Sequence, residues 1–395
     1  MMRHQLTLTK PDQFRPVSDS TLFDWKTSGI ALPGEWSIRQ RVLHGGVSEG
    51  VHVVDVCNGP LTVCVLPTRG MGVWNAELDG IPVGWNSPVK QPVHPQHVDL
   101  HGRNGLGWLE GFNELLCRCG LASVGPPGLD DGAVSPVESQ LTLHGRIANT
   151  PAHTVEVGVD PEARTLWIRG MCDEACLFGP HLRLTSLLTL HAGERFFTVR
   201  DEVQNLGASD TDLELLYHIN VGPPFLGEGS RVECSFAEMS PRDARAAEDI
   251  ESFATYLGPT PGYAEQVYLF DPRGDADGHC TALLRNATGD RGFSVAFDTR
   301  QLPCFTLWKC TQPEADGYVT GLEPGTNFPN FKAIERRQGR VRRLAAGESY
   351  VAELTIGVHD SAEAVAETSQ DIERMQTGRE PRIHSQPTEP FTIPC

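Results

Sequence analysis

The sequence has no apolar run of about 18 residues, which is the length that a membrane-spanning helix needs. Its first residues lack the continuous apolar stretch of a signal peptide. Positive charge is also scarce, because 33 lysines and arginines stand against 51 aspartates and glutamates and give a formal net charge of −18. Nucleic acids and anionic membranes are bound through basic patches, so this balance argues against both kinds of partner. We therefore expect a cytoplasmic protein that binds neither.

Cysteines with the spacing of a metal site are absent too. The chain has 11 cysteines, an odd number, without a Cys-x-x-Cys pair, and Cys117 and Cys119 stand too close together for a zinc knuckle. Their scatter through apolar segments indicates reduced, mostly buried thiols. Pro95 would break any helix that gathered three neighbouring histidines on one face, namely His94, His97 and His101. The sequence therefore predicts no metal site.

The helix–strand alternation of a parallel α/β fold is missing as well. Residues 51–56 and 61–66 are apolar runs on either side of Asn58-Gly59-Pro60, which predicts a hairpin. With 40 glycines and 29 prolines, the chain is rich in turn residues. Period-two alternation then recurs at 153–159, 165–170, 182–190, 195–203, 213–220, 292–297 and 304–309. This pattern is typical of an all-β fold of mainly antiparallel strands.

Three parts of the chain differ in character. Residues 1–45 are polar and broken by proline and glycine, so we expect an N-terminal arm that packs on the body. Residues 46–358, without internal repeat or low-complexity linker, form one β domain, with a short helix predicted at 107–116. In residues 359–395 we expect a helix over 361–375, capped by Asp360 with Glu363 in the capping-box position, and a loosely ordered proline-rich tail from residue 378.

Glu323 is the first candidate for catalysis. It precedes Pro324 and Gly325, which predict a turn directly after a strand end at residues 318–320. A carboxylate held at such a turn suits the role of general base, since reactive groups often sit on loops of a stiff scaffold. The alternative is an acidic side chain in a solvated turn.

Two histidines far upstream are the other candidates. His144 stands in a loop with Arg146 and Asn149, and this density of donors suits a polyol ligand, although His144 also fits a structural hydrogen-bonding role. His218 lies at the end of an apolar strand, and Asn220, two residues on, shares its face. A buried core histidine is the alternative for His218.

Three further side chains could contact a ligand. Arg69 precedes a glycine and has room to approach a ligand, or it pairs with a carboxylate of the fold. Trp108 either packs in the core or lines a binding site. Trp308 lies one strand and turn before Glu323, where its indole ring could stack on a sugar.

Several of these segments together resemble the motifs of a known family. Leu143-His144-Gly145, Tyr217-His218-Ile219-Asn220 and Leu322-Glu323-Pro324 with Asn327 and Pro329 resemble those of the aldose 1-epimerases, the galactose mutarotases. The longer phrases look more similar to the branch known as domain of unknown function 4432, over residues 45 to 357. They are Pro67-Thr68-Arg69-Gly70-Met71, Gly107-Trp108, Cys119-Gly120-Leu121, His144-Gly145-Arg146 and Gly321-Leu322-Glu323-Pro324-Gly325-Thr326-Asn327.

The resemblance implies a β-supersandwich of galactose mutarotase type with a few short helices and a site on the concave face of a large sheet. It implies that Glu323 takes the proton of the anomeric hydroxyl, that His218 protonates the ring oxygen, and that His144 orients the sugar. No cofactor is implied, because acid and base groups alone can open and close the ring. Each positioned acid or base contributes about 10²–10⁴ in rate.

The chain departs from well-known mutarotases at two places. Arg146 replaces the second glycine of their His-Gly-Gly motif, and Asn220-Val221-Gly222 stands where they have Tyr-Phe-Asn. These changes leave the sugar open, and arginine forks at 69 and 146 would suit a phosphate or carboxylate. The expected substrate-binding residues are Arg69, Arg146, Asn220, Trp308, Asn327 and Trp108.

The sequence thus predicts an isomerase, an aldose 1-epimerase acting on a free monosaccharide or sugar derivative. A carbohydrate-binding or sensing protein without turnover is the main alternative. An oligosaccharide lyase or hydrolase on the same fold is another, and a metal enzyme with His144, His218 and Glu323 as ligands is a more remote one. The partner expected is a small carbohydrate, and the oligomeric state stays open, a homodimer included.

Overall fold

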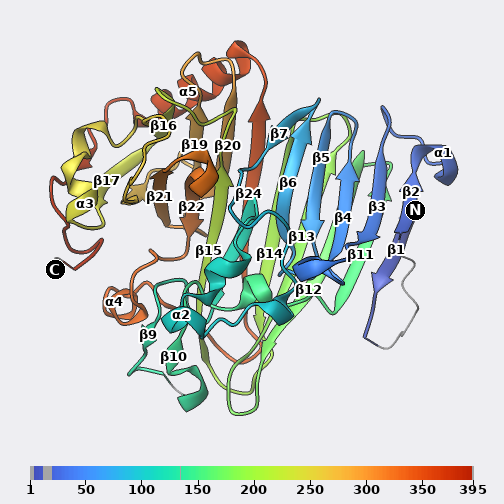
Figure 1. The fold of residues 1–395 in the computed structure, drawn as a ribbon, viewed down its shortest axis with the longest axis horizontal. Coiled ribbons are helices and arrows are strands. Elements are labelled where there is room, and N and C mark those ends of the chain that lie inside the picture. The colour runs from blue at the N-terminus through green and yellow to red at the C-terminus, as the bar shows by residue number, and fades with distance from the viewer. Residues whose placement is uncertain (1–3, 12–19, 134, 394–395) are drawn as a thin grey trace.

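The structure is a computed structural model that describes residues 4–11, 20–133 and 135–393. Two large antiparallel sheets lie against each other, with few helices around them (Figure 1). The predicted all-β fold is therefore confirmed. Among the described strands, β17 and β25 form the one parallel pair.

The larger sheet has 14 described strands in the order β2-β3-β4-β5-β6-β8-β15-β22-β21-β18-β17-β25, with β7 beside β6 and β23 beside β15. Their bounds are β2 Ser20–Asp24, β3 Ser37–Val42, β4 His52–Cys57, β5 Leu61–Leu66, β6 Gly72–Leu78, β7 Ile81–Val83, β8 Leu116–Leu121, β15 Thr211–Val221, β17 Phe236–Pro241, β18 Gln266–Pro272, β21 Cys304–Thr311, β22 Tyr318–Gly325, β23 Arg342–Leu344 and β25 Arg382–Ile383.

The smaller sheet has nine described strands in the order β1-β11-β12-β13-β14-β24-β20-β19-β16. Their bounds are β1 His4–Thr9, β11 Thr154–Asp160, β12 Thr165–Ala175, β13 His181–His191, β14 Phe196–Asn205, β16 Arg231–Cys234, β19 His279–Arg285, β20 Gly292–Asp298 and β24 Ser349–His359. A separate two-stranded ribbon pairs β9 Gly128–Leu129 with β10 Gln140–Leu141.

The helices of the described chain are short except the last. They are α1 Trp25–Ser28, α2 Gly102–Gly105, α3 Ala244–Glu248, α4 Lys332–Arg337 and α5 Ala362–Gln376. Single 3₁₀ turns occupy Gly46–Ser48, Pro95–His97, Gly107–Gly111, Pro136–Glu138, Ile147–Asn149, Ile250–Ser252 and Glu314–Asp316. Within the described ranges, none of these helices has both the length and the apolar character needed to cross a membrane.

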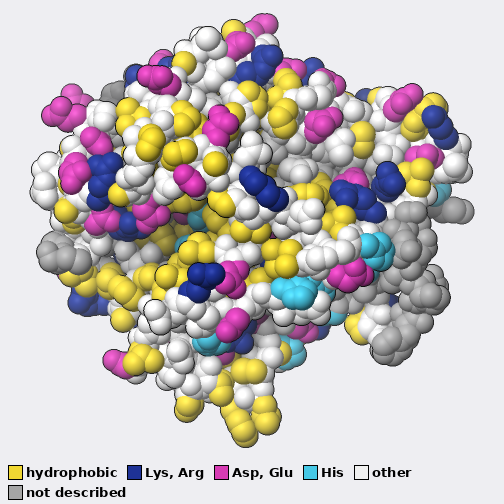
Figure 2. All heavy atoms as spheres, in the orientation of Figure 1, with side chains coloured by type: hydrophobic (Ala, Val, Ile, Leu, Met, Phe, Trp, Pro, Cys, Tyr) yellow, Lys and Arg dark blue, Asp and Glu magenta, His cyan; other side chains and the backbone are white. Residues whose placement is uncertain are grey.

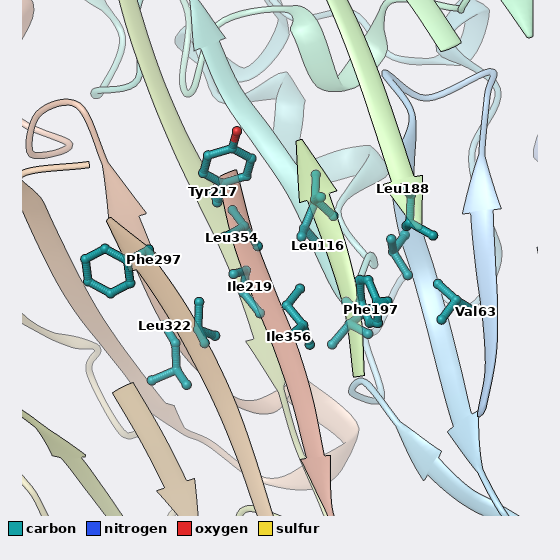
Figure 3. Packing of buried hydrophobic residues seen from close by; sticks show 14 of the residues in the cluster. Val63, Leu116, Leu188, Phe197, Tyr217, Ile219, Phe297, Leu322, Leu354 and Ile356 are labelled. Carbon is teal, nitrogen blue, oxygen red and sulfur yellow. The ribbon is translucent and has the colours of Figure 1, made fainter. Parts of the chain in front are cut away.

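The main core lies between the two sheets. Alternate residues of β13 are buried, as a strand with one face on a core requires. Figure 3 shows the resulting contact, in which Leu188, Phe197 and Ile356 of the smaller sheet face Val63 and Leu116 of the larger one. Each side chain buried in this way contributes about 1.5–3 kcal/mol of hydrophobic stabilisation.

The hairpin expected around Asn58-Gly59-Pro60 is confirmed, since β4 and β5 pair antiparallel. Gly59 has φ +115°, a conformation that glycine adopts far more readily than other residues. Before this hairpin, β1 adds to the edge of the smaller sheet, while β2 and β3 extend the larger one. The ten cysteines of the described chain are free thiols, most of them buried.

The predicted helix at 107–116 is wrong over half its length. A 3₁₀ turn covers Gly107–Gly111, and residue 116 already begins β8, which is buried throughout. The helical spacing of Trp108 and Phe112 arises because both rings pack on the same side of this turn, at a centroid distance of 4.5 Å.

The C-terminal helix is confirmed, but its cap differs from the prediction. The hydroxyl of Ser361 accepts the hydrogen bond from the Ala364 amide, whereas Asp360 accepts one from Arg195. The tail is also more ordered than predicted. It adds β25 beside β17 and buries Phe391, and the carbonyl of Phe391 accepts a hydrogen bond of 2.7 Å from Asn330.

Glu323 lies inside β22 and not on a turn, because Pro324 and Gly325 continue the strand. Proline has no amide hydrogen to give to a ladder. Its position is tolerated here because the pairing between β15 and β22 is interrupted between the pairs Ile219–Leu322 and Leu216–Gly325. On the other side, β21 pairs with β22 without interruption.

A buried ion pair joins the two sheets. Arg118 of β8 donates to Asp201 of β14, to Ser186 and to the carbonyl of Met71, and the hydroxyl of Tyr217 donates to Asp201 at 2.9 Å. The charged groups of Arg118 and Asp201 are almost entirely shielded from water. Hydrogen bonds therefore have to replace the hydration that both charges lose on folding.

We expect Asp201→Ala to lower the free energy of unfolding by about 3–5 kcal/mol, because the guanidinium of Arg118 would stay buried without its counter-ion. Asp210→Ala is the matched control, since it removes the exposed partner of Arg343 and should cost less than about 1 kcal/mol. Urea unfolding measures both, with Asp201→Asn as a milder variant should the alanine variant fail to fold. Equal costs at the two sites would contradict the assigned role of the buried pair.

Candidate active site

A cavity of about 520 Å³ opens on the face of the larger sheet that points away from the main core. It lies between the α3 side and the α4 side of the molecule. In Figure 2 this part of the surface is hollowed, with hydrophobic side chains within and charged side chains along the α3 side. His144, His218 and Glu323, which are far apart in the sequence, all line it.

The alternation of β15 places His218 there. Leu215, Tyr217 and Ile219 point into the core between the sheets, whereas Leu216 belongs to a second apolar cluster on the opposite face. His218 shares the face of Leu216, because side chains two residues apart in a strand point the same way.

Asn220 fixes the orientation of the His218 ring from behind. Its amide nitrogen donates to the carbonyls of Glu114 and His218, so its amide oxygen is the atom 2.7 Å from Nδ1 of His218. A carbonyl oxygen only accepts, and Nδ1 therefore carries a hydrogen. The neutral ring then presents the lone pair of Nε2 on its other side.

Glu323 stands opposite that lone pair, with Oε1 at 3.3 Å from Nε2 of His218. Burial raises the pKa of the Glu323 carboxyl well above its usual value, and burial together with nearby His144 lowers the pKa of His218 to about 3. Both shifts favour a neutral pair in which the proton between the two groups resides on the carboxyl. The two groups together hold one proton that can move.

His144 approaches from a loop and has the left-handed φ of +57°. Its Nδ1 donates to the carbonyl of Val124 at 2.7 Å, which leaves Nε2 for a ligand. Burial lowers the pKa of His144, but the sulfur of Cys119 and the Val124 carbonyl outweigh it and raise the pKa to about 9. A protonated His144 would donate from Nε2 toward the cavity.

Aromatic rings surround the three groups. Trp108 lies 4.7 Å from His144, and Phe112 and Trp308 lie 5.0 and 5.4 Å from His218, measured between ring centroids. Both tryptophans thus line the cavity, as expected of ligand-binding residues. The indole nitrogen of Trp308 donates to Glu265 at 2.8 Å.

The cavity also contains groups that sequence reasoning missed. Thr306 pairs with Glu323 across β21 and β22, and its hydroxyl is buried without a hydrogen-bond partner in the described chain. The period-two rule could have found it, because Thr306 and Trp308 share one face of β21. Nothing in the sequence pointed to Thr392 and Ile393 of the tail, which line the cavity as well.

Arg69 is a correction, because it does not line this cavity. Its guanidinium is buried and donates to the Glu114 carboxylate at 2.6 Å, to Asn149, and to the carbonyls of Val93 and Gly111. Gly70 beside it lies so close to the carbonyl of Ile147 that a side chain there would clash, so this glycine allows contact with another backbone segment rather than with a ligand. Arg69 is therefore not among the side chains that line the cavity.

Three more predicted binding residues lie outside the cavity lining. Arg146 is exposed and faces a separate small depression beside Glu138 and Glu174. Asn220 is fully buried behind His218. Asn327 is also fully buried, and its amide donates to Glu214 at 3.0 Å. These three expectations are corrected in the same way.

Asn327 and Arg69 nevertheless support the histidines from behind. Asn327 donates to Glu214, which accepts the amide hydrogen of Val124, and the Val124 carbonyl holds His144. Arg69 is bonded to Glu114, whose carbonyl accepts a hydrogen bond from Asn220.

Comparisons with known proteins agree with the fold. A provisionally named aldose 1-epimerase from Klebsiella pneumoniae is 36% identical, with a TM-score of 0.93 over 98% of this chain and 99% of that one. A galactose mutarotase-like protein from Clostridium acetobutylicum is 16% identical, with a TM-score of 0.56 over 82% and 98% of the two chains. A provisionally named aldose 1-epimerase from Escherichia coli K12 is 15% identical, with a TM-score of 0.54 over 78% and 99%.

No curated protein matches the sequence. The family model described as "Domain of unknown function (DUF4432)" matches residues 48–358, which is most of the chain. This match and the likeness to the Klebsiella pneumoniae protein cover the region that was expected to resemble that family. The chain therefore belongs to the DUF4432 family and has the galactose mutarotase-like fold.

Proposed function

We propose that this protein is an aldose 1-epimerase, which interconverts the α and β anomers of a sugar with a free anomeric hydroxyl. The observation that carries the proposal is the contact of 3.3 Å between His218 and Glu323 in a cavity walled by aromatic rings. Opening of the sugar ring needs an acid and a base side by side, because the anomeric hydroxyl and the ring oxygen are bonded to the same carbon. The pair supplies both.

One mobile proton is enough for the reaction. When it passes from the carboxyl of Glu323 to Nε2 of His218, the carboxylate becomes the base and the imidazolium becomes the acid. Glu323 then takes the proton of the anomeric hydroxyl while His218 protonates the ring oxygen, and the carbon–oxygen bond of the ring breaks to give the free aldehyde. Rotation about the neighbouring carbon–carbon bond and closure by the reverse transfers produce the other anomer.

The remaining groups hold the sugar. His144 is placed to donate from Nε2 to a sugar oxygen, which helps to place the ring between acid and base. Trp108 and Trp308 offer flat apolar surfaces to the carbon–hydrogen faces of the ring. The unpaired Thr306 hydroxyl and the Trp108 indole nitrogen are buried groups that substrate hydroxyls would satisfy.

Glu323→Gln is expected to lower the rate of anomer exchange by at least about 10²-fold, because the amide can neither take up nor pass on the proton. Exchange is followed by polarimetry or NMR on a panel of freshly dissolved sugars, and binding by calorimetry. Glu156→Gln on β11, outside the cavity, is the matched control and should keep the native rate. Sugar binding with equal exchange in Glu323→Gln and the native protein would point to a binding or sensing protein instead.

Glu323→Gln is also expected to stabilise the fold increasingly as the pH rises from 5 to 8. The pKa of Glu323 is higher in the folded than in the unfolded chain, so its contribution to stability is complete below about pH 4.3 and is lost as the pH approaches the folded value. The difference in unfolding free energy between variant and native protein should grow by about 1.4 kcal/mol for each pH unit between the unfolded and the folded pKa of Glu323.

Urea unfolding of both proteins at pH 5 and pH 8 gives this difference. His218, whose lowered pKa costs stability in acid, is present in both proteins and cancels to first order. A difference that stayed constant or shrank with rising pH would show that the carboxyl does not carry its proton in the folded protein.

A further inference from the structure

The cavity extends well beyond the acid–base pair. Its volume of about 520 Å³ falls in the range of about 300–1,000 Å³ that holds drug-sized ligands. Such ligands are larger than a single sugar ring. His144, His218 and Glu323 with the two tryptophans occupy its inner part. Its outer part has two contrasting edges, one apolar and one charged.

The apolar edge consists of Leu106, Leu109 and Phe331. These side chains are 38%, 46% and 52% exposed, and each of them lines the cavity. Large apolar side chains gathered at the opening of a pocket mark a binding surface more often than scattered exposed ones do. Ile334 of α4 and Ile393 of the tail continue this surface inward.

The charged edge consists of Arg242, Asp243 and Glu265. Arg242 donates to Asp243 at 2.8 Å and to Glu265 at 3.0 Å, and Glu265 in turn accepts from the indole of Trp308. The three groups are therefore held in place and connected to the inner part. Their carboxylate oxygens have further lone pairs that hydroxyl groups can use.

We propose that the substrate is a neutral reducing disaccharide, whose reducing ring lies at His218 and Glu323 and whose second ring binds between these two edges. The proposal rests on the epimerase function and adds the class of sugar. A pyranose ring is itself two-sided, with a carbon–hydrogen face for Leu109 and Phe331 and hydroxyl edges for Arg242 and Glu265. A purely apolar substituent would leave the charged edge desolvated without partners, which is costly.

The charges at the outer part of the cavity favour a neutral second ring. Arg242 is the one arginine or lysine among the described lining residues, and two carboxylates already neutralise it. The sequence suggests Arg69 and Arg146 as partners for a phosphate or carboxylate group of the ligand, but both lie outside the cavity. An anionic second ring would meet Asp243 and Glu265, because the histidines that can carry a positive charge lie in the inner part of the cavity.

The test compares anomer exchange of glucose and galactose with that of maltose, cellobiose, lactose and melibiose. At least one disaccharide should show a kcat/KM about tenfold or more above that of its reducing monosaccharide. Phe331→Ser and Leu109→Ser should lower the disaccharide kcat/KM about tenfold more than the monosaccharide value, since lost apolar contact costs about 10–200-fold in such sites. Phe178→Ser and Leu177→Ser make the same changes at more exposed residues outside this cavity and should alter neither value.

Monosaccharides that react as well as every disaccharide, or variants that slow both classes equally, would overturn the proposal. Calorimetric binding of the same sugars to Glu323→Gln separates it from the epimerase function. If no sugar exchanges faster with the native protein, the proposed function fails. Tighter binding of a disaccharide that Phe331→Ser weakens would still support the outer subsite, and equal affinities would refute it.

Discussion

Side chains of a β-strand point alternately to its two faces, and β15 is covered on both. Its odd-numbered residues from Leu213 to Val221 enter the core between the sheets. Its even-numbered residues point to the opposite face of the larger sheet, where Leu216 packs in the second apolar cluster and His218 faces the cavity. One strand thus provides both the hydrophobic contact that holds the sheets together and the imidazole of the candidate site. A register shift of one residue in β15 would destroy both at once.

Polar groups buried behind the site have to find partners inside the protein, and this requirement orients both histidines. Arg69 and Glu114 hold Asn220, and Asn220 holds His218. Asn327 and Glu214 hold Val124, whose carbonyl holds His144. Each of these two series of hydrogen bonds begins at a buried side chain, Arg69 or Asn327, that is hydrogen-bonded to other protein groups. The ring orientations are consequently set by the fold before any ligand arrives, which reduces the entropy lost on binding.

Much of this fold could be predicted from sequence, because antiparallel strands with alternating burial carry a local signal. The β4–β5 hairpin and the strand that contains His218 are of this kind. Pro324 and Gly325 usually mark a turn, which predicts a turn position for Glu323, and the interrupted pairing with β15 explains why they remain in a strand here. Local sequence does not contain that information, since it depends on a neighbouring strand about 100 residues away.

The site could be predicted less completely than the fold, for the same reason. Arginine and asparagine have the same donors whether they face a ligand or a buried carboxylate, and the partner of Arg69 lies 45 residues further along the chain. Thr306 carries a weak local signal, and the tail residues Thr392 and Ile393 carry none. Of the residues that the sequence singled out, His144, His218 and Glu323 line the cavity, together with Trp108 and Trp308.

Polar atoms that are buried without partners are costly to the folded protein and so have physical meaning. The hydroxyl of Thr306 and the indole nitrogen of Trp108 are buried without hydrogen bonds in the described chain, and both residues line the cavity. Each unsatisfied buried group costs about 1–3 kcal/mol. Fully apolar replacements would remove the cost, so their presence together in one cavity argues for a ligand that supplies the missing bonds. A polyol, with a hydroxyl on most of its carbons, can accept from the indole nitrogen and can donate to or accept from the threonine hydroxyl.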